Sequence, residues 1–361
     1  MVYSVSTLSS SLRLTDYLID HRARLDKAVI ENASEKHADI GLALGSQTGL
    51  TTSFRTEHSQ LVSQLDTNRQ LVTRLDVMET ALDNVHTNGS EFRSNLIALK
   101  QNSESLKTAS GLARTELGKL TNALNSNVGG VYVFGGVNTG TSPVRDFEYE
   151  SDPLDPTDPL GPEEAIKDAF NTHFSLTIGL DTDEAAIKAL SAADWEGFLD
   201  SSAFNNVFDA NWTPTWSSAT DPDKKMTATI GNGVTTVGSG SANEEAFKSM
   251  AKGYSMIAVF GGLDIQKDAE ALIADRAIDN LNQATGKVID LEANTGAIKA
   301  NVERTNTDIE AKKDVLNLRI NDLENVDPNR AAVELSMAQT QLETTYAITA
   351  KIQNLNIMKY L

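Results

Sequence analysis

Residues 281–323 read LNQATGKVIDLEANTGAIKANVERTNTDIEAKKDVLNLRINDL, and this stretch decides the fold. Its seam residues recur at alternating steps of three and four, which places them on one face of a helix. The seam consists of Leu281, Ala284, Val288, Leu291, Thr295, Ile298, Val302, Thr305, Ile309, Lys312, Leu316, Arg319 and Leu323. The pattern predicts one helix over 266–323. Asp327-Pro328 then breaks it, and Pro328 suits the first turn of a further helix that runs to the end of the sequence.

The N-terminal part of the chain carries the same rhythm in three predicted helices, over 4–32, 47–85 and 91–127. Two glycines within 38–45 favour a bend or an irregular loop between the first two helices. Asn88-Gly89-Ser90 is typical of a turn between the second and third helices, with Ser90 as a cap. A short turn between long helices predicts an antiparallel pair. After the third helix, the glycine-rich segment 129–136 predicts a short strand between turns.

The middle of the chain has a different composition. Seven of the eight prolines lie between 143 and 222, and all three tryptophans and eight of eleven phenylalanines lie within 145–262. Within it we expect a helix over 163–174, a strand over 174–178, a hairpin over 226–237 and a helix that starts at Asn243 and ends near Gly261. The fold class is therefore mainly α: a long antiparallel coiled-coil or helical bundle formed by both chain ends, with a small mixed α/β domain inserted in the middle.

This pattern predicts three nested domains. The terminal helical domain combines 1–40 with 325–361, and the rod-like domain with a short β-hairpin combines 41–144 with 263–324. The inserted domain is 145–262, which holds 20 acidic and 7 basic residues, a net charge of −13 in a chain of −19. The termini are nearly neutral, as close packing between like copies requires. The acidic balance argues against nucleic acid as a partner.

No residues form a pattern typical of catalysis or of a metal or cofactor site. The five histidines have no partner at the spacing of metal ligands, and there is no cysteine. We interpret Asp152, Asp155 and Asp158 as a solvated linker instead of a calcium loop, and the three tryptophans as core residues instead of a glycan platform. The start of the sequence predicts no ordinary secretory signal peptide, and no segment is apolar enough to predict membrane insertion. We expect a structural protein that is not an enzyme.

Three segments carry a resemblance to a known family. They are 38–45, with Asp39-Ile40-Gly41; 132–139, which reads YVFGGVNT; and 326–361, which runs from Val326-Asp327-Pro328 to Met358-Lys359-Tyr360-Leu361. In this order they resemble the flagellin superfamily, and most closely hook-associated protein 3 of the alphaproteobacterial type, the hook–filament junction protein. Flagellins usually carry an Asp-Asp-Ala-Ala-Gly stretch after the first helix, whereas this chain reads EKHADIG over 35–41.

The resemblance implies a subunit secreted through the flagellar type III export apparatus with an export chaperone. It would form a ring of copies in the extracellular flagellum, next to another hook-associated protein and flagellin, and so serve motility. Its terminal helices would line the inner tube and the insert would face outward.

We expect the terminal helices to assemble through apolar residues that are too sparse to stabilise an isolated helix. The predicted subunit-interface residues are Leu8, Leu12, Leu18, Leu25, Leu335, Leu342, Ile348, Ile352 and Leu355. Other interpretations stay open: a minor flagellin, an adhesin or hydrolase displayed on a helical stalk, a signalling coiled coil, or an intramolecular bundle that does not polymerise.

Overall fold

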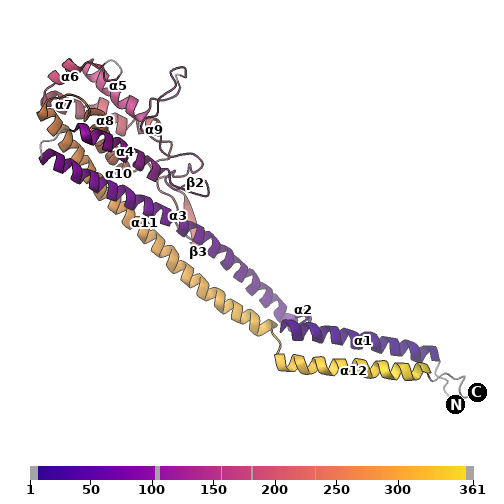
Figure 1. Cartoon of the computed structure of the whole chain (residues 1–361). Coiled ribbons are helices and arrows are strands. Elements are labelled where there is room, and N and C mark those ends of the chain that lie inside the picture. The colour runs from indigo at the N-terminus through magenta and orange to yellow at the C-terminus, as the bar shows by residue number, and fades with distance from the viewer. Residues whose placement is uncertain (1–6, 102–105, 156, 180–181, 232, 355–361) are drawn as a thin grey trace, which may run out of the picture. The chain divides into compact units, whose positions relative to one another are not determined.

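The computed structural model describes residues 7–101, 106–155, 157–179, 182–231 and 233–354, and their side chains between 12 and 351. It divides into two compact units (Figure 1). Unit 1 comprises the described parts of Met1–Ser63 and Asp308–Leu361, and unit 2 is Gln64–Thr307. The division falls inside two long helices, α3 (Thr48–Gln101) and α11 (Lys267–Glu324). The rod helix predicted over 266–323 is thus confirmed.

Unit 1 is built around two helices, α1 (Thr7–Ser34) and α12 (Pro328–Asn354), which lie side by side and antiparallel (Figure 1). Pro328 opens α12 as predicted. The bend expected over 38–45 is instead a short helix, α2 (Ile40–Leu44), followed by the 3-10 turn η1 (Gly45–Gln47). The Asp39 carboxylate caps α2 by accepting a hydrogen bond of 2.9 Å from the Leu42 N–H, so local capping overcomes the glycine at position 41.

The turn predicted at Asn88-Gly89-Ser90 is wrong, because α3 continues through it without a break. Gly89 is buried, and a Cβ at this position would lie 2.7 Å from Cε of Met250 on α10 (Glu245–Phe260). The glycine therefore serves a close helix–helix approach instead of a turn. The helix predicted over 91–127 is accordingly split between the end of α3 and α4 (Lys107–Leu124).

One hydrophobic core holds unit 2 together, and it crosses both boundaries of the expected inserted domain. It joins α3, α4 and α11 to α10 and to the short helices of the insert. Phe260 shows this best, because its ring lies within 6.2 Å of the rings of Phe170, Trp195, Phe198 and Phe204. The short helices are α5 (Pro162–Phe174), α6 (Glu184–Ala189), α7 (Ala192–Leu199), α8 (Ser202–Phe208) and α9 (Trp212–Thr215).

The tryptophans of unit 2 belong to this core. Trp195, Trp212 and Trp216 are at most 2% exposed, and the last two stack with centroids 5.1 Å apart. This confirms the interpretation of the three tryptophans as core residues instead of a glycan platform. The strand predicted over 174–178 is wrong: Ser175 follows α5 with a left-handed φ of 54°, which ends the helix in a loop.

Two small hairpins complete unit 2. The first pairs β1 (Asn127–Val128) with β2 (Val131–Tyr132), and Gly129 and Gly130 supply the two positive φ angles of its tight turn. The second pairs β3 (Thr227–Gly231) with β4 (Val234–Val237), as the sequence predicts. Strand β2 lies within 129–136, the segment where the sequence predicts a short strand between turns.

The segment that follows β2 fastens the insert to the long helices. Gly136 N–H donates to Gly240 O at 2.9 Å, and Ala242 N–H donates to Phe134 O at 2.8 Å. Phe134 also packs edge-on against Phe247 of α10, with centroids 5.6 Å apart. The residues 133–136 therefore act as a clasp between α4 and the end of the insert.

Gly136→Ala is expected to weaken this clasp. Gly136 has a φ of 66°, and an added Cβ would come within 1.9 Å of Thr220 Oγ1 and 3.0 Å of Lys224 O. Strain of this kind costs about 1–3 kcal/mol, which chemical denaturation of the full chain would measure. The matched control is Gly140→Ala, where a Cβ would meet nothing within 4 Å. Equal unfolding free energies of the two variants would contradict the role of Gly136 in the clasp.

An ion-pair network joins α4 to α5. Arg114 donates to Glu163 at 2.7 and 2.8 Å and to Glu148 at 2.9 Å, and Lys167 lies 2.9 Å from Glu163. Burial alone would raise the pKa of Glu163, but the hydrogen bonds from Arg114 and Lys167 outweigh it and leave the pKa lowered. The Glu163 bonds raise the pKa of Arg114 against the effect of its own burial.

This network predicts a pH dependence of stability. A carboxylate whose pKa is depressed on folding stabilises the protein above its unfolded pKa, and that stability is lost as the pH falls through the folded value. Arg114→Ala should lower the unfolding free energy at pH 7 by about 1–3 kcal/mol, less than for a fully buried pair because Arg114 is partly exposed. The difference in unfolding free energy between wild type and Arg114→Ala should shrink as the pH falls below about 4.5. A difference that stays constant between pH 7 and pH 3 would contradict this role.

Candidate assembly surface

The α1–α12 pair buries one narrow stripe from each helix. Ala28, Ala331 and Ala338 are buried, and Leu14, Leu18, Leu25, Leu335 and Leu342 are half-buried on the same faces. Within this described part of the pair, the fully buried apolar side chains are thus all alanines. Burial of so little apolar surface leaves a helix pair marginally stable by itself.

Charged groups lie where the C-terminal end of α1 meets the N-terminal end of α12. Glu324 at the end of α11 is fully buried, and its Oε2 accepts from Arg55 at 2.6 Å and lies 3.6 Å from Lys36 Nζ. His37 N–H donates to Glu324 O at 2.9 Å, and Val326 N–H donates to Glu35 O at 2.9 Å. The segment after α1 is therefore tied to the corner between α11 and α12.

The large apolar side chains of unit 1 are exposed to an unusual degree. Of 21 exposed large hydrophobic side chains in the described structure, 14 lie in unit 1, although unit 2 contains far more residues. These fourteen are Leu12, Tyr17, Ile19, Val29, Ile30, Leu42, Leu50, Val62, Val315, Leu318, Val333, Met337, Tyr346 and Ile348. Contiguous apolar exposure marks an interaction surface.

Three of these side chains on each terminal helix form a second apolar stripe. On α1, Leu12, Ile19 and Ile30 are separated by 7 and 11 residues, which places them on one face, nearly opposite the stripe that meets α12. Their exposed fractions are 59%, 61% and 51%. We name this face the outer α1 stripe. A helix with two apolar faces in so small a unit lacks a partner for one of them.

Helix α12 repeats the arrangement. Val333, Met337 and Ile348 lie on a face turned away from its buried stripe and are 57%, 52% and 49% exposed. We name this face the outer α12 stripe. Met337 borders two grooves of the helix pair, one of about 400 Å³ that runs past His21 and Thr344 and one of about 280 Å³ that runs past Arg24. Grooves of this size can receive side chains from another helix, as ridges fit into grooves.

The predicted interface residues divide between these faces. Leu18, Leu25, Leu335 and Leu342 are half-buried in the α1–α12 pair within the chain, whereas Leu12 and Ile348 lie on the outer stripes. The side chains of Leu8 and Ile352, and the whole of Leu355, lie outside the described residues. Sequence analysis missed Ile19, Ile30, Val333 and Met337. Their signal was a second set of apolar residues, at spacings of 4, 7 and 11, that share a helix face other than that of the first stripe.

Acidic substitutions on the outer stripes should block assembly without unfolding the monomer. Ile19→Glu or Met337→Glu would place a charge where we expect another copy to bury an apolar side chain, which costs several kcal/mol per contact. We expect an unchanged melting temperature and a loss of incorporation into the assembly that the resemblance implies, scored by immunoblot of that assembly after its isolation from cells. Leu154→Glu is the matched control, because Leu154 is 90% exposed on a loop of unit 2. If both stripe variants were incorporated normally, the outer stripes would not be part of the assembly surface.

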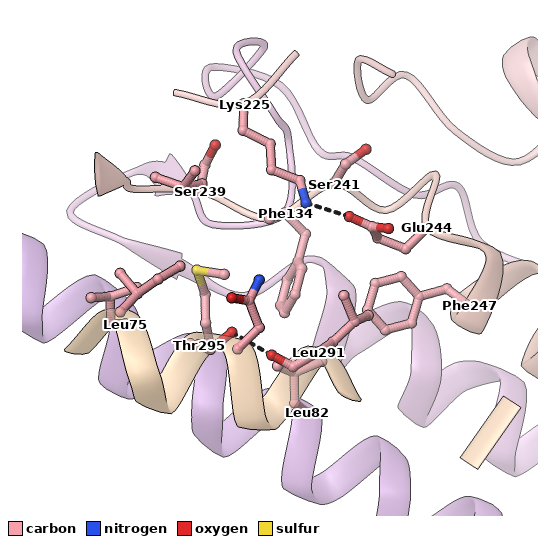
Figure 2. A pocket seen from close by; sticks show the side chains of 15 residues that line it. Leu75, Leu82, Phe134, Lys225, Ser239, Ser241, Glu244, Phe247, Leu291 and Thr295 are labelled. Carbon is pink, nitrogen blue, oxygen red and sulfur yellow. Dashed lines mark hydrogen bonds and ion pairs between the residues drawn. The ribbon is translucent and has the colours of Figure 1, made fainter. Parts of the chain in front are cut away.

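A small cavity lies near the clasp in unit 2 and is lined mainly by apolar side chains that include Leu75, Phe134 and Phe247 (Figure 2). Lys225 and Glu244 form an ion pair of 2.6 Å at its edge. Its volume of about 30 Å³ matches roughly one water molecule and is far below the 300–1,000 Å³ of ligand pockets. We therefore interpret it as a packing defect and not as a substrate site.

The described residues contain no cluster of three or more histidine, aspartate or glutamate side chains placed to hold a metal ion. None of their helices has both the length and the apolar character needed to span a bilayer.

Comparison with known families identifies both ends of the chain. The model of the bacterial flagellin N-terminal helical region matches residues 5–139, and the model of the bacterial flagellin C-terminal helical region matches residues 278–361. The matched residues include all of α1 and all of α12, which carry the outer stripes. Comparison with curated proteins finds no match.

Proposed function

Because this chain belongs to the bacterial flagellin superfamily, we propose that it is the subunit that joins the flagellar hook to the filament. Members of this family are structural proteins without enzymatic activity that assemble into the extracellular flagellum. The chain is therefore a structural flagellar subunit. The specific position at the junction is our proposal.

One observation carries the assembly part of the proposal: the outer stripes expose six large apolar side chains of unit 1. Each fully buried side chain of this type contributes roughly 1.5–3 kcal/mol before entropy losses. The α1–α12 pair thus gains most of its apolar burial from other copies. We infer that ordering of the terminal helices is coupled to polymerisation.

The sequence between α1 and α3 supports the junction position. The segment 35–41 lacks the stretch typical of filament flagellins and is similar to that of hook-associated protein 3. In the structure this segment lies against Glu324 and includes the Asp39 cap of α2, so it has a defined structural role in this chain. Its neighbours in the assembly would be another hook-associated protein on one side and flagellin on the other. Delivery through the type III export apparatus with an export chaperone is part of the same proposal.

A gold-labelled antibody against 145–262, viewed on isolated flagella, tests the position. We expect a thin band where the hook meets the filament. Label along the whole filament would support a minor flagellin instead, which the family matches fit equally well. Absence of the chain from isolated flagella, both by label and by immunoblot under denaturing conditions, would contradict both assignments.

A further inference from the structure

We propose that the outer edge of strand β4 pairs with a second copy of this chain in the assembled flagellum. This inference rests on the proposed function in one respect, namely that copies of the chain lie side by side in a flagellum. It concerns unit 2 and adds a contact to those of the terminal helices.

The two edges of the β3–β4 hairpin differ in what occupies them. Helix α3 covers the β3 side: Gln64 Nε2 donates to Thr229 O at 2.7 Å, and Asn68 Nδ2 donates to Ile230 O at 2.8 Å. Asn68 Nδ2 also reaches Asn306 Oδ1 at 2.7 Å, which ties the hairpin to both long helices of unit 2. Strand β3 is therefore already bonded on both sides.

The register of the hairpin shows which groups of β4 point outward. Gly238 N–H donates to Met226 O at 2.7 Å, and hydrogen-bonded pairs recur at every second residue of an antiparallel ladder. Thr236 consequently faces Ala228 with both of its backbone groups. The N–H and C=O groups of Thr235 and Val237 are directed away from β3, and no described backbone group outside the hairpin bonds to them.

Strand β4 also lacks the usual protection of an edge. Natural sheets block exposed edges with lysine, proline, bulges on the edge strand or a covering helix. Here the four residues are Val234-Thr235-Thr236-Val237, all β-branched and uncharged, and the bulge of the hairpin lies on β3. Such an edge accepts a further strand through main-chain hydrogen bonds.

The charge distribution indicates that the occupant is another copy of the chain. Residues 226–243 contain no charged side chain, and neither do residues 120–144. The two segments lie together, because Gly240 N–H donates to Val133 O at 2.8 Å and Gly136 N–H donates to Gly240 O at 2.9 Å. Their exposed valines, Val137 and Val234, are 56% and 51% exposed. Copies with a net charge of −19 repel one another, so close contact favours this neutral surface.

Photo-crosslinking of the full-length chain tests the proposal. The chain has no cysteine to which a crosslinker could be attached. The photoreactive amino acid benzoylphenylalanine would therefore replace Thr235, and isolated flagella would be irradiated. We expect a covalent product of twice the chain mass whose peptides come only from this chain. The matched control places the same probe at Thr227, an exposed threonine on the covered strand β3, and should give little of this product.

Two variants test the main-chain contact. Thr235→Pro removes one outward N–H, whereas Thr235→Val keeps it. With a second probe at Val234, we expect the crosslinked dimer to fall about fivefold in the proline variant, as for the loss of one hydrogen bond, and to stay unchanged in the valine variant. If the proline variant has a lower melting temperature as a monomer, Thr235→Lys replaces it, and the same decrease is expected.

The outcomes separate this inference from the function on which it rests. Wild-type chain absent from flagella would overturn the proposed function. Wild-type chain present in flagella, with no dimer from Thr235 or with a crosslink to a different protein, would overturn only the β4 contact.

Discussion

Removal of residues 1–35 or 330–361 is expected to abolish incorporation into flagella and leave unit 2 folded. Either deletion removes one member of the α1–α12 pair together with its outer stripe. The hydrophobic core of unit 2 contains residues from Leu71 to Val302 only, so neither deletion takes away a side chain of that core. Loss of motility should accompany the loss of incorporation.

The measurement has two parts. Near-ultraviolet circular dichroism of the purified fragments should keep the signal of the buried tryptophans, because all three lie in unit 2. Complementation of a strain that lacks the protein should fail with either fragment. A truncated chain that restored motility would show that the deleted terminal helix is not needed for incorporation. A fragment that lost its tryptophan signal would show that unit 2 does not fold without it.

Phe260→Ala should cause the largest loss of stability of any single substitution considered. The ring of Phe260 is fully buried at the end of α10 and touches aromatic rings of α5, α7 and α8. Truncation of a buried phenylalanine costs about 3–5 kcal/mol through lost burial and a residual cavity. Because these contacts join the long helices to the insert, we expect unit 2 to keep a single unfolding transition at a lower denaturant concentration.

Leu154→Ala is the control for this substitution, since a side chain that is 90% exposed should change stability by less than about 0.5 kcal/mol. Tryptophan fluorescence reports the insert, and far-ultraviolet circular dichroism reports the long helices. Separate transitions by the two probes would instead support an insert, 145–262, that folds independently. That division into three domains remains a prediction from composition.

Long helices with a sustained seam were the most predictable elements. The rhythm over 281–323 and Pro328 located α11 and the start of α12, since these signals depend only on neighbours three and four residues apart. Gly89 shows the limit of such reasoning. Asn88-Gly89-Ser90 has the composition of a turn, but Met250 is distant in sequence and its packing on Gly89 favours an unbroken helix.

The assembly surface could be predicted only in part. Leu12 and Ile348 were predicted as interface residues and are exposed, whereas Leu18 and Leu342, which were also predicted, are half-buried in the α1–α12 pair. A single sequence shows that a helix has apolar positions. It does not show which of two apolar faces meets a helix of the same chain, because that depends on the partner's position.

The sequence by itself determined the helical arms, the uncharged and acidic regions, and the family to which both ends belong. These properties depend on short-range periodicity and composition, which are present in any window of the chain. Tertiary structure alone decided that Gly136 closes a clasp, that the insert shares the core of α3 and α11, and which stripes remain exposed. Each of these depends on contacts between residues far apart in sequence, and burial is a property of such contacts and not of a residue type.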